Sequence, residues 1–160
     1  MSSGAPYAYA LGYKFPQQVR NLYIFSGTPA LYDKTVLAHW PYPANQEATL
    51  PELEQLAHEL FFSNLSAADL ENKAIQDSMM NHGFGIAQDL QLRCRDWGFS
   101  LSEVRAKVFM QHSRTDESVP FITAELTSRL LPNCILDIRD SGAHFSDEAL
   151  DDFIRTTMLN

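Results

Sequence analysis

The chain has 160 residues, of which 45% are hydrophobic and 20% are charged, a composition typical of one folded globular domain. Its net charge of −8 at pH 7 repels phosphate backbones and anionic lipids, so we expect no nucleic acid and no membrane as partners. No apolar run approaches the ~18 residues that a membrane span needs. The first basic residue is Lys14, too late for the positive start of a signal peptide, so we expect a cytoplasmic location.

The N-terminal stretch predicts a helix over residues 7–13, because its apolar residues have the spacing of a buried helix face. Pro6 is tolerated in the first turn of that helix. Residues 21–25, NLYIF, predict a short buried strand that ends at a turn over 26–29. The side chains expected on the buried face of the helix are Tyr7, Ala8, Leu11 and Gly12.

The middle of the chain, residues 29–99, predicts mainly helices. Thr49 and Glu52 have the spacing of a capping box, and Ser66 with Asp69 repeats that start signal. Residues 84–97 favour a third helix. The apolar residues expected to form a stripe on the first of these helices are Leu53, Leu56, Leu60 and Phe61.

The last third of the chain predicts an alternation of strands and helices. Strands are expected over 107–112 and 134–138, with a helix over 121–131 between them. Ser100 and Glu103 again have capping-box spacing, and Ser146 is placed to cap a final helix. Alternating strands and helices indicate a parallel sheet covered on both faces. The side chains expected on one face of the middle helix are Ile122, Leu126 and Leu130.

Two side chains of chemical interest follow the two predicted strands. Asp116 comes after the strand over 107–112, and His144 comes after the strand over 134–138. Loops at the carboxyl ends of adjacent parallel strands lie side by side, where such sheets bind ligands. A carboxylate beside an imidazole fixes its tautomer and stabilises the imidazolium, as the general base of a serine nucleophile requires. The alternatives are an Asp that forms a turn or caps a helix, and a His exposed on a loop.

The segments VFMQHSRTDESVP and LPNCILDIRDSGAHFS resemble the last two strand-loop units of the α/β-hydrolase fold. In that family an acid is followed by Val-Pro at the start of a helix, and the next strand leads to Gly-x-His. These positions are occupied here by Asp116, Val119-Pro120, Gly142 and His144. Ser113 departs from the pattern, because many members have Gly there. The resemblance implies that Asp116 is the acid and His144 the base of a catalytic triad.

The first residues resemble the nucleophile elbow of the same family, G-x-S-x-G, which lies on a sharp turn from strand to helix. Ser2 stands at the nucleophile position and Gly4 at the final glycine, while the first glycine would fall before Met1. Ser3 would be the nucleophile if the register slipped by one, but the glycine spacing would then fail. The resemblance also implies that the backbone N–H of Ser3 contributes to an oxyanion hole.

The resemblance implies an α/β fold, a partial α/β-hydrolase with a short parallel sheet of the last three strands, flanking helices and a helical cap insertion. We expect a single incomplete domain over 1–160, with the elbow, a helix and a strand in 1–28, the cap in 29–99 and the β-α-β-α unit in 100–160. The first five strands of the family, with the loop that supplies half of the oxyanion hole, have no counterpart here. Met1 is then an internal methionine of a longer reading frame, or the chain is a relic.

The function that the resemblance implies is a serine hydrolase that cleaves an ester, amide or related bond of a small molecule with an apolar portion. The alternative is a truncated, catalytically impaired module or interaction domain, whose exposed sheet edge would favour a homodimer. The aromatic and Met residues of the predicted cap would line an apolar pocket or form core. They are Trp40, Tyr42, Phe61, Phe62, Met79, Met80, Phe84 and Trp97.

We expect no cofactor and no metal. His58-Glu59 lacks the second histidine of a zinc helix, and structural or surface roles are expected for His39, His82 and His112. Cys94 and Cys134 have neither metal nor redox spacing. Two reduced thiols are the expectation, and a disulfide is the alternative.

Overall fold

The computed structural model describes residues 1–43 and 46–159; residues 44–45, in the predicted middle block, and residue 160 lie outside the described part. The chain divides into two compact units, one of residues 1–41 with 97–160 and one of residues 42–96. Strands are described only in the first unit, and the described secondary structure of the second is helical.

The first unit contains a parallel sheet in the order β1-β2-β3, formed by β1 (Asn21–Phe25), β2 (Lys107–Ser113) and β3 (Cys134–Arg139). The predicted strands and their parallel arrangement are confirmed, with β2 and β3 each one residue longer than predicted. Sequential parallel strands need a crossover connection, and α7 (Phe121–Leu130) supplies it between β2 and β3.

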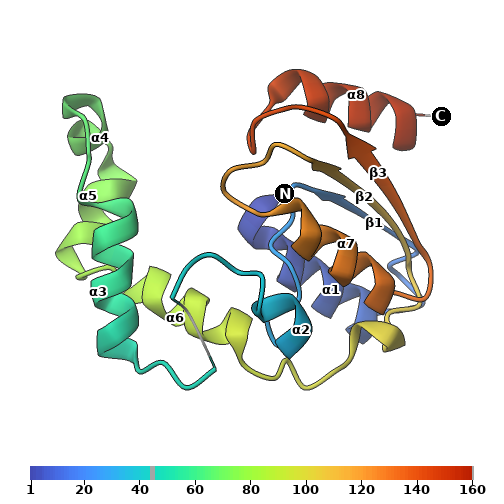
Figure 1. Cartoon of the computed structure of the whole chain (residues 1–160), viewed down its shortest axis with the longest axis horizontal. Coiled ribbons are helices and arrows are strands. Elements are labelled where there is room, and N and C mark those ends of the chain that lie inside the picture. Colours follow the sequence, from blue (N-terminus) through green and yellow to red (C-terminus); the bar gives the residue numbers. More distant parts are fainter. Residues whose placement is uncertain (44–45, 160) are drawn as a thin grey trace. The chain divides into compact units, whose positions relative to one another are not determined.

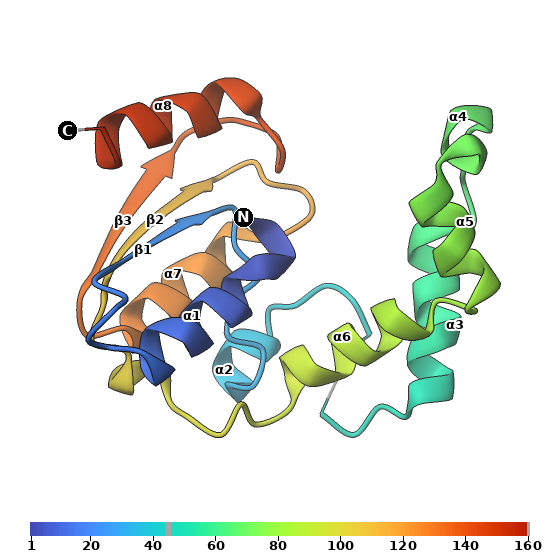
Figure 2. The ribbon, with the colours of Figure 1, turned by 180° about the vertical axis from the view of Figure 1, so that it is seen from behind.

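Helices cover both faces of this sheet. The helices α1 (Ala5–Lys14) and α7 lie on one face, and α8 (Asp147–Thr157) lies on the other (Figures 1 and 2). On the α8 side, the rings of Phe25 and Phe153 approach to 6.1 Å between centroids. The main core fills the space between the sheet and the other two helices. Its buried members include Ala5, Tyr9, Leu22, Ile24, Val108, Met110 and Ala124.

The buried face of α1 differs from the prediction. Tyr7 and Leu11 are 53% and 52% exposed, while Tyr9 and Gly12 are buried. The reason is close packing of the helix on the sheet: a Cβ at Gly12 would lie only 2.9 Å from Leu22 Cδ1. The buried face of α1 therefore runs along Ala5, Tyr9 and Gly12, with the glycine at the point of closest approach to β1. The prediction of Tyr7 and Leu11 as buried was wrong.

The helix α7 repeats this pattern. Its buried side chains are Thr123, Ala124 and Thr127, and the predicted face of Ile122, Leu126 and Leu130 is only partly buried. The Thr127 hydroxyl accepts a hydrogen bond of 3.0 Å from the Ala30 amide, in the loop after β1. A polar group on the core side of α7 thus ties that loop to the helix.

The second unit consists of α3 (Leu50–Phe61), α4 (Ala67–Glu71), α5 (Lys73–Met80) and α6 (Phe84–Cys94). The predicted capping boxes at its first two helices are present, with Glu52 accepting from the Thr49 amide and Asp69 from the Ser66 amide. The helix α6 ends at Cys94, before the predicted residue 97. The remaining short elements belong to the first unit: α2 (Lys34–Leu37) and the 3₁₀ helices η1 (Ser2–Gly4) and η2 (Leu101–Glu103).

Gly27 provides a test of the packing between α1 and β1. A Cβ at Gly27 would lie 2.4 Å from Ile24 Cγ2 and 2.9 Å from Ala5 Cβ. We expect Gly27→Ala to lower the free energy of unfolding by about 1–3 kcal/mol in urea denaturation, because the core has no room for a methyl group. Gly85→Ala is the control, since nothing lies within 4 Å of its added Cβ. Equal stability of the Gly27→Ala variant and the wild type would contradict this packing.

Candidate active site

The loops after β2 and β3 leave the sheet at the same edge. The register of the two strands runs as far as Ser113 opposite Arg139, and the Arg114 amide still donates to the Arg139 carbonyl at 2.9 Å. Asp116 lies in the first loop and His144 in the second. The parallel pairing therefore brings together two side chains that are 28 residues apart in the chain.

Asp116 and His144 form a buried hydrogen-bonded pair. His144 Nδ1 lies 2.7 Å from Asp116 Oδ2, and each residue is only 7% exposed. The other carboxylate oxygen, Oδ1, accepts from the amides of Ser118 and Val119 at 2.9 Å each. Burial alone would raise the pKa of Asp116, but the hydrogen bonds from His144 and Val119 and the charge of a histidinium outweigh it and hold that pKa below its ordinary value. The carboxylate is thus ionised and oriented.

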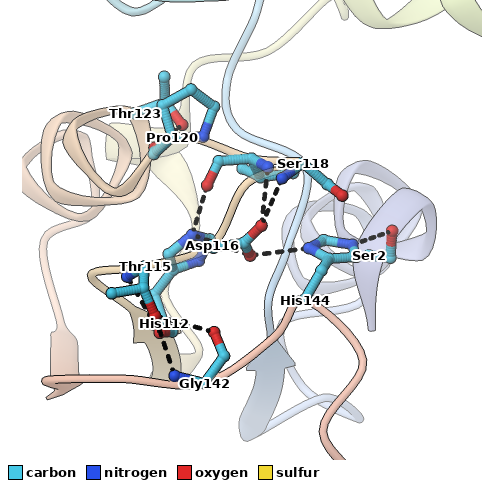
Figure 3. A network of polar contacts seen from close by, with 11 residues as sticks. Ser2, His112, Thr115, Asp116, Ser118, Pro120, Thr123, Gly142 and His144 are labelled. Atoms are coloured by element: carbon cyan, nitrogen blue, oxygen red, sulfur yellow. Dashed lines mark hydrogen bonds and ion pairs between the residues drawn. The ribbon is translucent and has the colours of Figure 1, made fainter.

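Ser2 completes the line on the other side of the imidazole. Figure 3 shows Ser2 joined to the imidazole of His144, and its Oγ lies 2.9 Å from His144 Nε2. Because a carboxylate only accepts, His144 Nδ1 carries the hydrogen and Nε2 is free to accept the Ser2 hydroxyl proton. Ser2, His144 and Asp116 therefore stand in the order hydroxyl, imidazole, carboxylate.

The backbone of Ser2 is strained. Its φ is 44°, in the left-handed region that residues other than glycine rarely adopt. Ser2 begins η1, which runs directly into α1, and its carbonyl accepts from the Thr28 amide at 3.0 Å. The loop after β1 thus holds this turn from outside the helix.

Ser3 also lies in the first turn of that helix. The amides of a first helical turn have no acceptor within the helix, so the Ser3 N–H is a donor available beside Ser2. Among the described residues, the serine hydroxyl that contacts His144 is that of Ser2, with no contact from Ser3. The register with Ser2 at the centre is therefore the one that fits the geometry.

Two polar residues near Asp116 were not predicted as part of the site. His112, expected to be structural or on the surface, is buried with its Nε2 2.9 Å from the Val119 carbonyl oxygen and 3.4 Å from Asp116 Oδ2. Its place on the core face of β2 follows from the alternation with Val108 and Met110. Its contact with the acid depends on how the loop folds back, which no local pattern indicates.

Thr115 links the loop of the acid to the loop of the histidine. Its hydroxyl oxygen accepts from the Gly142 amide at 3.0 Å and donates to the Gly142 carbonyl at 3.3 Å. Gly142 has a φ of 146°, which a side chain would not tolerate easily. The contact joins residues that stand one and two positions before Asp116 and His144.

The described residues offer neither a reactive cysteine nor a metal site. Cys94 and Cys134 are free thiols, and burial raises the pKa of each to about 11, so neither is a ready thiolate. No group of three or more His, Cys, Asp or Glu within 1–43 and 46–159 is arranged to hold a metal ion. His39, His58 and His82 are exposed. No helix of the described ranges is long and apolar enough to cross a membrane.

Solved structures with a similar fold are α/β-hydrolase enzymes. An esterase from Exiguobacterium antarcticum matches 94% of this chain and 62% of its own, with 18% identity and a TM-score of 0.53. An α/β-hydrolase from a deep-sea metagenome library matches 97% of this chain and 60% of its own (13% identity, TM-score 0.57), and an enol-lactonase from Burkholderia xenovorans LB400 matches 98% and 61% (12% identity, TM-score 0.57). No protein-family model and no curated protein matches the chain.

The chain spans about three fifths of the length of the solved structures that it matches. At these identities the likeness concerns the fold. The chain has a partial α/β-hydrolase fold, with three parallel strands and the flanking helices described above.

The low pKa of Asp116 predicts a pH dependence of stability. A carboxyl group whose pKa is lower in the folded state stabilises that state above its unfolded pKa of about 4, and this contribution is lost as the pH falls through the folded value. We expect the free energy of unfolding in urea to fall below about pH 4, and to fall less steeply in Asp116→Asn, which no longer titrates. Parallel curves for the two proteins would show that the Asp116 carboxylate has no stabilising partner.

Proposed function

We propose that this chain carries the catalytic triad of a serine hydrolase that cleaves an ester, amide or related bond, with Ser2 as nucleophile, His144 as general base and Asp116 as the acid that orients it. The observation that carries the proposal is the unbroken line of hydrogen bonds from Ser2 Oγ through His144 to Asp116, at 2.9 Å and 2.7 Å. The left-handed backbone of Ser2 supports it, because such a strained turn at the start of a helix exposes a nucleophilic hydroxyl.

The proposed reaction follows the geometry. Ser2 Oγ attacks the carbonyl carbon of the substrate while its proton passes to His144 Nε2. The resulting imidazolium is stabilised by Asp116 Oδ2 and then protonates the leaving group as the C–O or C–N bond breaks. A water molecule attacks the acyl-Ser2 ester, with His144 again taking a proton and returning it to Ser2. The negative oxygen of each tetrahedral intermediate would accept from the Ser3 N–H.

The proposed substrate is a small molecule with an apolar portion. Phe145, which is 64% exposed, packs nearly perpendicular to the His144 ring with centroids 4.4 Å apart. An exposed aromatic ring beside the proposed base offers an apolar surface to a bound acyl or leaving group. The proposed location is the cytoplasm, because the free thiols Cys94 and Cys134 fit its reducing conditions.

A fluorophosphonate probe tests the nucleophile. We expect the wild type to be labelled covalently and Ser2→Ala to lose labelling, because the probe phosphonylates an activated serine. We expect Asp116→Asn to label more slowly by on the order of 10⁴, since the carboxylate no longer selects the Nδ1–H tautomer of His144. Intact mass spectrometry gives the extent of labelling.

Ser3→Ala is the matched control, because it removes the neighbouring hydroxyl and keeps the Ser3 backbone N–H. It should label like the wild type. Labelling that survives Ser2→Ala, or that depends on the Ser3 hydroxyl, would disprove the assignment of Ser2.

The second candidate function is an interaction module with impaired catalysis. Within the described sheet, β1 pairs only with β2, and Tyr7, Leu11 and Phe15 are all more than two fifths exposed at intervals of four residues along α1 and its C-cap. Unpaired strand edges and apolar patches favour self-association.

Size-exclusion chromatography with light scattering distinguishes the two candidates. The interaction module is expected to elute as a dimer, through the β1 edge and the exposed apolar side chains of α1, and to lack fluorophosphonate labelling. Leu11→Glu should shift that dimer toward monomer, because a carboxylate would be buried in the interface. A labelled monomer would exclude the interaction module.

A further inference from the structure

His112 has an unusual environment for a buried polar side chain. It is 1% exposed. It lies beside Asp116, on the side away from His144 (Figure 3). Its Nε2 lies 2.9 Å from the Val119 carbonyl oxygen, and its Nδ1 has no hydrogen-bond partner among the described residues. Because a carbonyl oxygen only accepts, Nε2 must carry the hydrogen, and in a neutral ring Nδ1 is then a bare acceptor.

Packing alone does not account for an imidazole at this position. A buried acceptor without a partner destabilises the folded state, whereas an aliphatic side chain of similar volume would fill the same space without that cost. The hydrogen bond to Val119 and the neighbouring carboxylate are the contacts that an aliphatic residue could not replace.

These contacts connect His112 with the proposed triad. The backbone of Val119 is held at both of its polar groups: its N–H donates to Asp116 Oδ1 at 2.9 Å, and its C=O accepts from His112. His112 lies on β2 and Val119 lies two residues before α7 begins, so the bond between them closes the loop in which Asp116 stands. His112 Nε2 is also 3.4 Å from Oδ2, the oxygen that accepts from His144.

We propose that His112 is a positioning residue: its Nε2–H fixes the backbone of Val119, and through it the Asp116 carboxylate, in the orientation in which Oδ2 accepts the Nδ1–H of His144. It acts through Asp116 and touches neither the nucleophile nor a substrate. Its consequence for catalysis rests on the proposed function, but its effect on the Asp116–His144 pair does not.

The charge state of His112 agrees with this role. Burial lowers its pKa, and a protonated His144 lowers it further, against the opposing effects of the Val119 hydrogen bond and Asp116. A neutral His112 leaves the carboxylate with a single cationic partner, so the proton taken from Ser2 stays on His144.

The experiment is NMR of the whole chain labelled with ¹⁵N-histidine, on the wild type and on His112→Leu and His112→Gln. The hydrogen-bonded Nδ1–H of His144 is observed directly, and its exchange with water reports how firmly Asp116 holds it. We expect exchange roughly tenfold faster in His112→Leu, the factor that corresponds to losing one net hydrogen bond. His112→Gln keeps an N–H donor at a similar reach and should restore most of the protection.

The wild type alone gives a second test, which holds even if His112→Leu fails to fold. The ¹⁵N shifts of His112 should show a neutral ring with the hydrogen on Nε2. A hydrogen on Nδ1, or a folded His112→Leu with wild-type exchange at His144, would overturn the proposal. An equal loss of His144 Nδ1–H protection in His112→Leu and His112→Gln would also overturn the proposal, because the N–H donor would then have no effect.

Fluorophosphonate labelling of the same variants separates this proposal from the proposed function. If the wild type is not labelled, the hydrolase assignment fails, while the exchange data still decide the role of His112. If the wild type is labelled, His112→Leu should label more slowly than His112→Gln at the same pH.

Discussion

The parallel pairing of β2 with β3 is the constraint on which the candidate site depends. It directs both strands to the same edge of the sheet and holds the register as far as Ser113 and Arg139. The loops that follow can then carry Asp116 and His144 to a separation of 2.7 Å between their side-chain atoms. A slip of the register by one residue would turn alternate side chains to the opposite face, and the loops would no longer start level with each other.

The third member of the site, Ser2, is positioned by other elements than the acid and the histidine. Ser2 precedes α1, and α1 packs so closely on the sheet that a Cβ at Gly12 would lie 2.9 Å from Leu22 Cδ1. The loop after β1 holds the Ser2 carbonyl through the Thr28 amide. Ser2 is therefore positioned by β1 and its loop, and the acid and the histidine by β2 and β3. All three strands thus help to position the side chains that form the line of hydrogen bonds.

The sequence predicted the parts of this arrangement that depend on local patterns. The strands were predicted from short apolar runs bounded by turn residues. The starts of three helices were predicted from side chains that can hydrogen-bond to the nearby backbone, those of Thr49, Ser66 and Ser146. The positions of Asp116 and His144 followed from topology, because the ends of adjacent parallel strands must meet.

Features that depend on tertiary packing were not predictable in this way. The buried face of α1 was misplaced, since apolar residues stand on several sides of this helix and the close approach at Gly12 decides which side meets the sheet. The contact of His112 with Asp116 was also missed. From the sequence, a histidine on the core face of a strand is interpreted as structural, because its contact with the following loop depends on how that loop folds.

The central claim is that Ser2 Oγ is a nucleophile activated by His144. Its most direct test is a rapid-mixing experiment with p-nitrophenyl butyrate, in which release of p-nitrophenolate is followed and the protein is then quenched in acid for peptide mapping. If Ser2 is the nucleophile, we expect a burst of product stoichiometric with the chain and a butyryl group on Ser2. Steady release without a burst, or an acyl group on Ser3 or on His144 in place of Ser2, would contradict it.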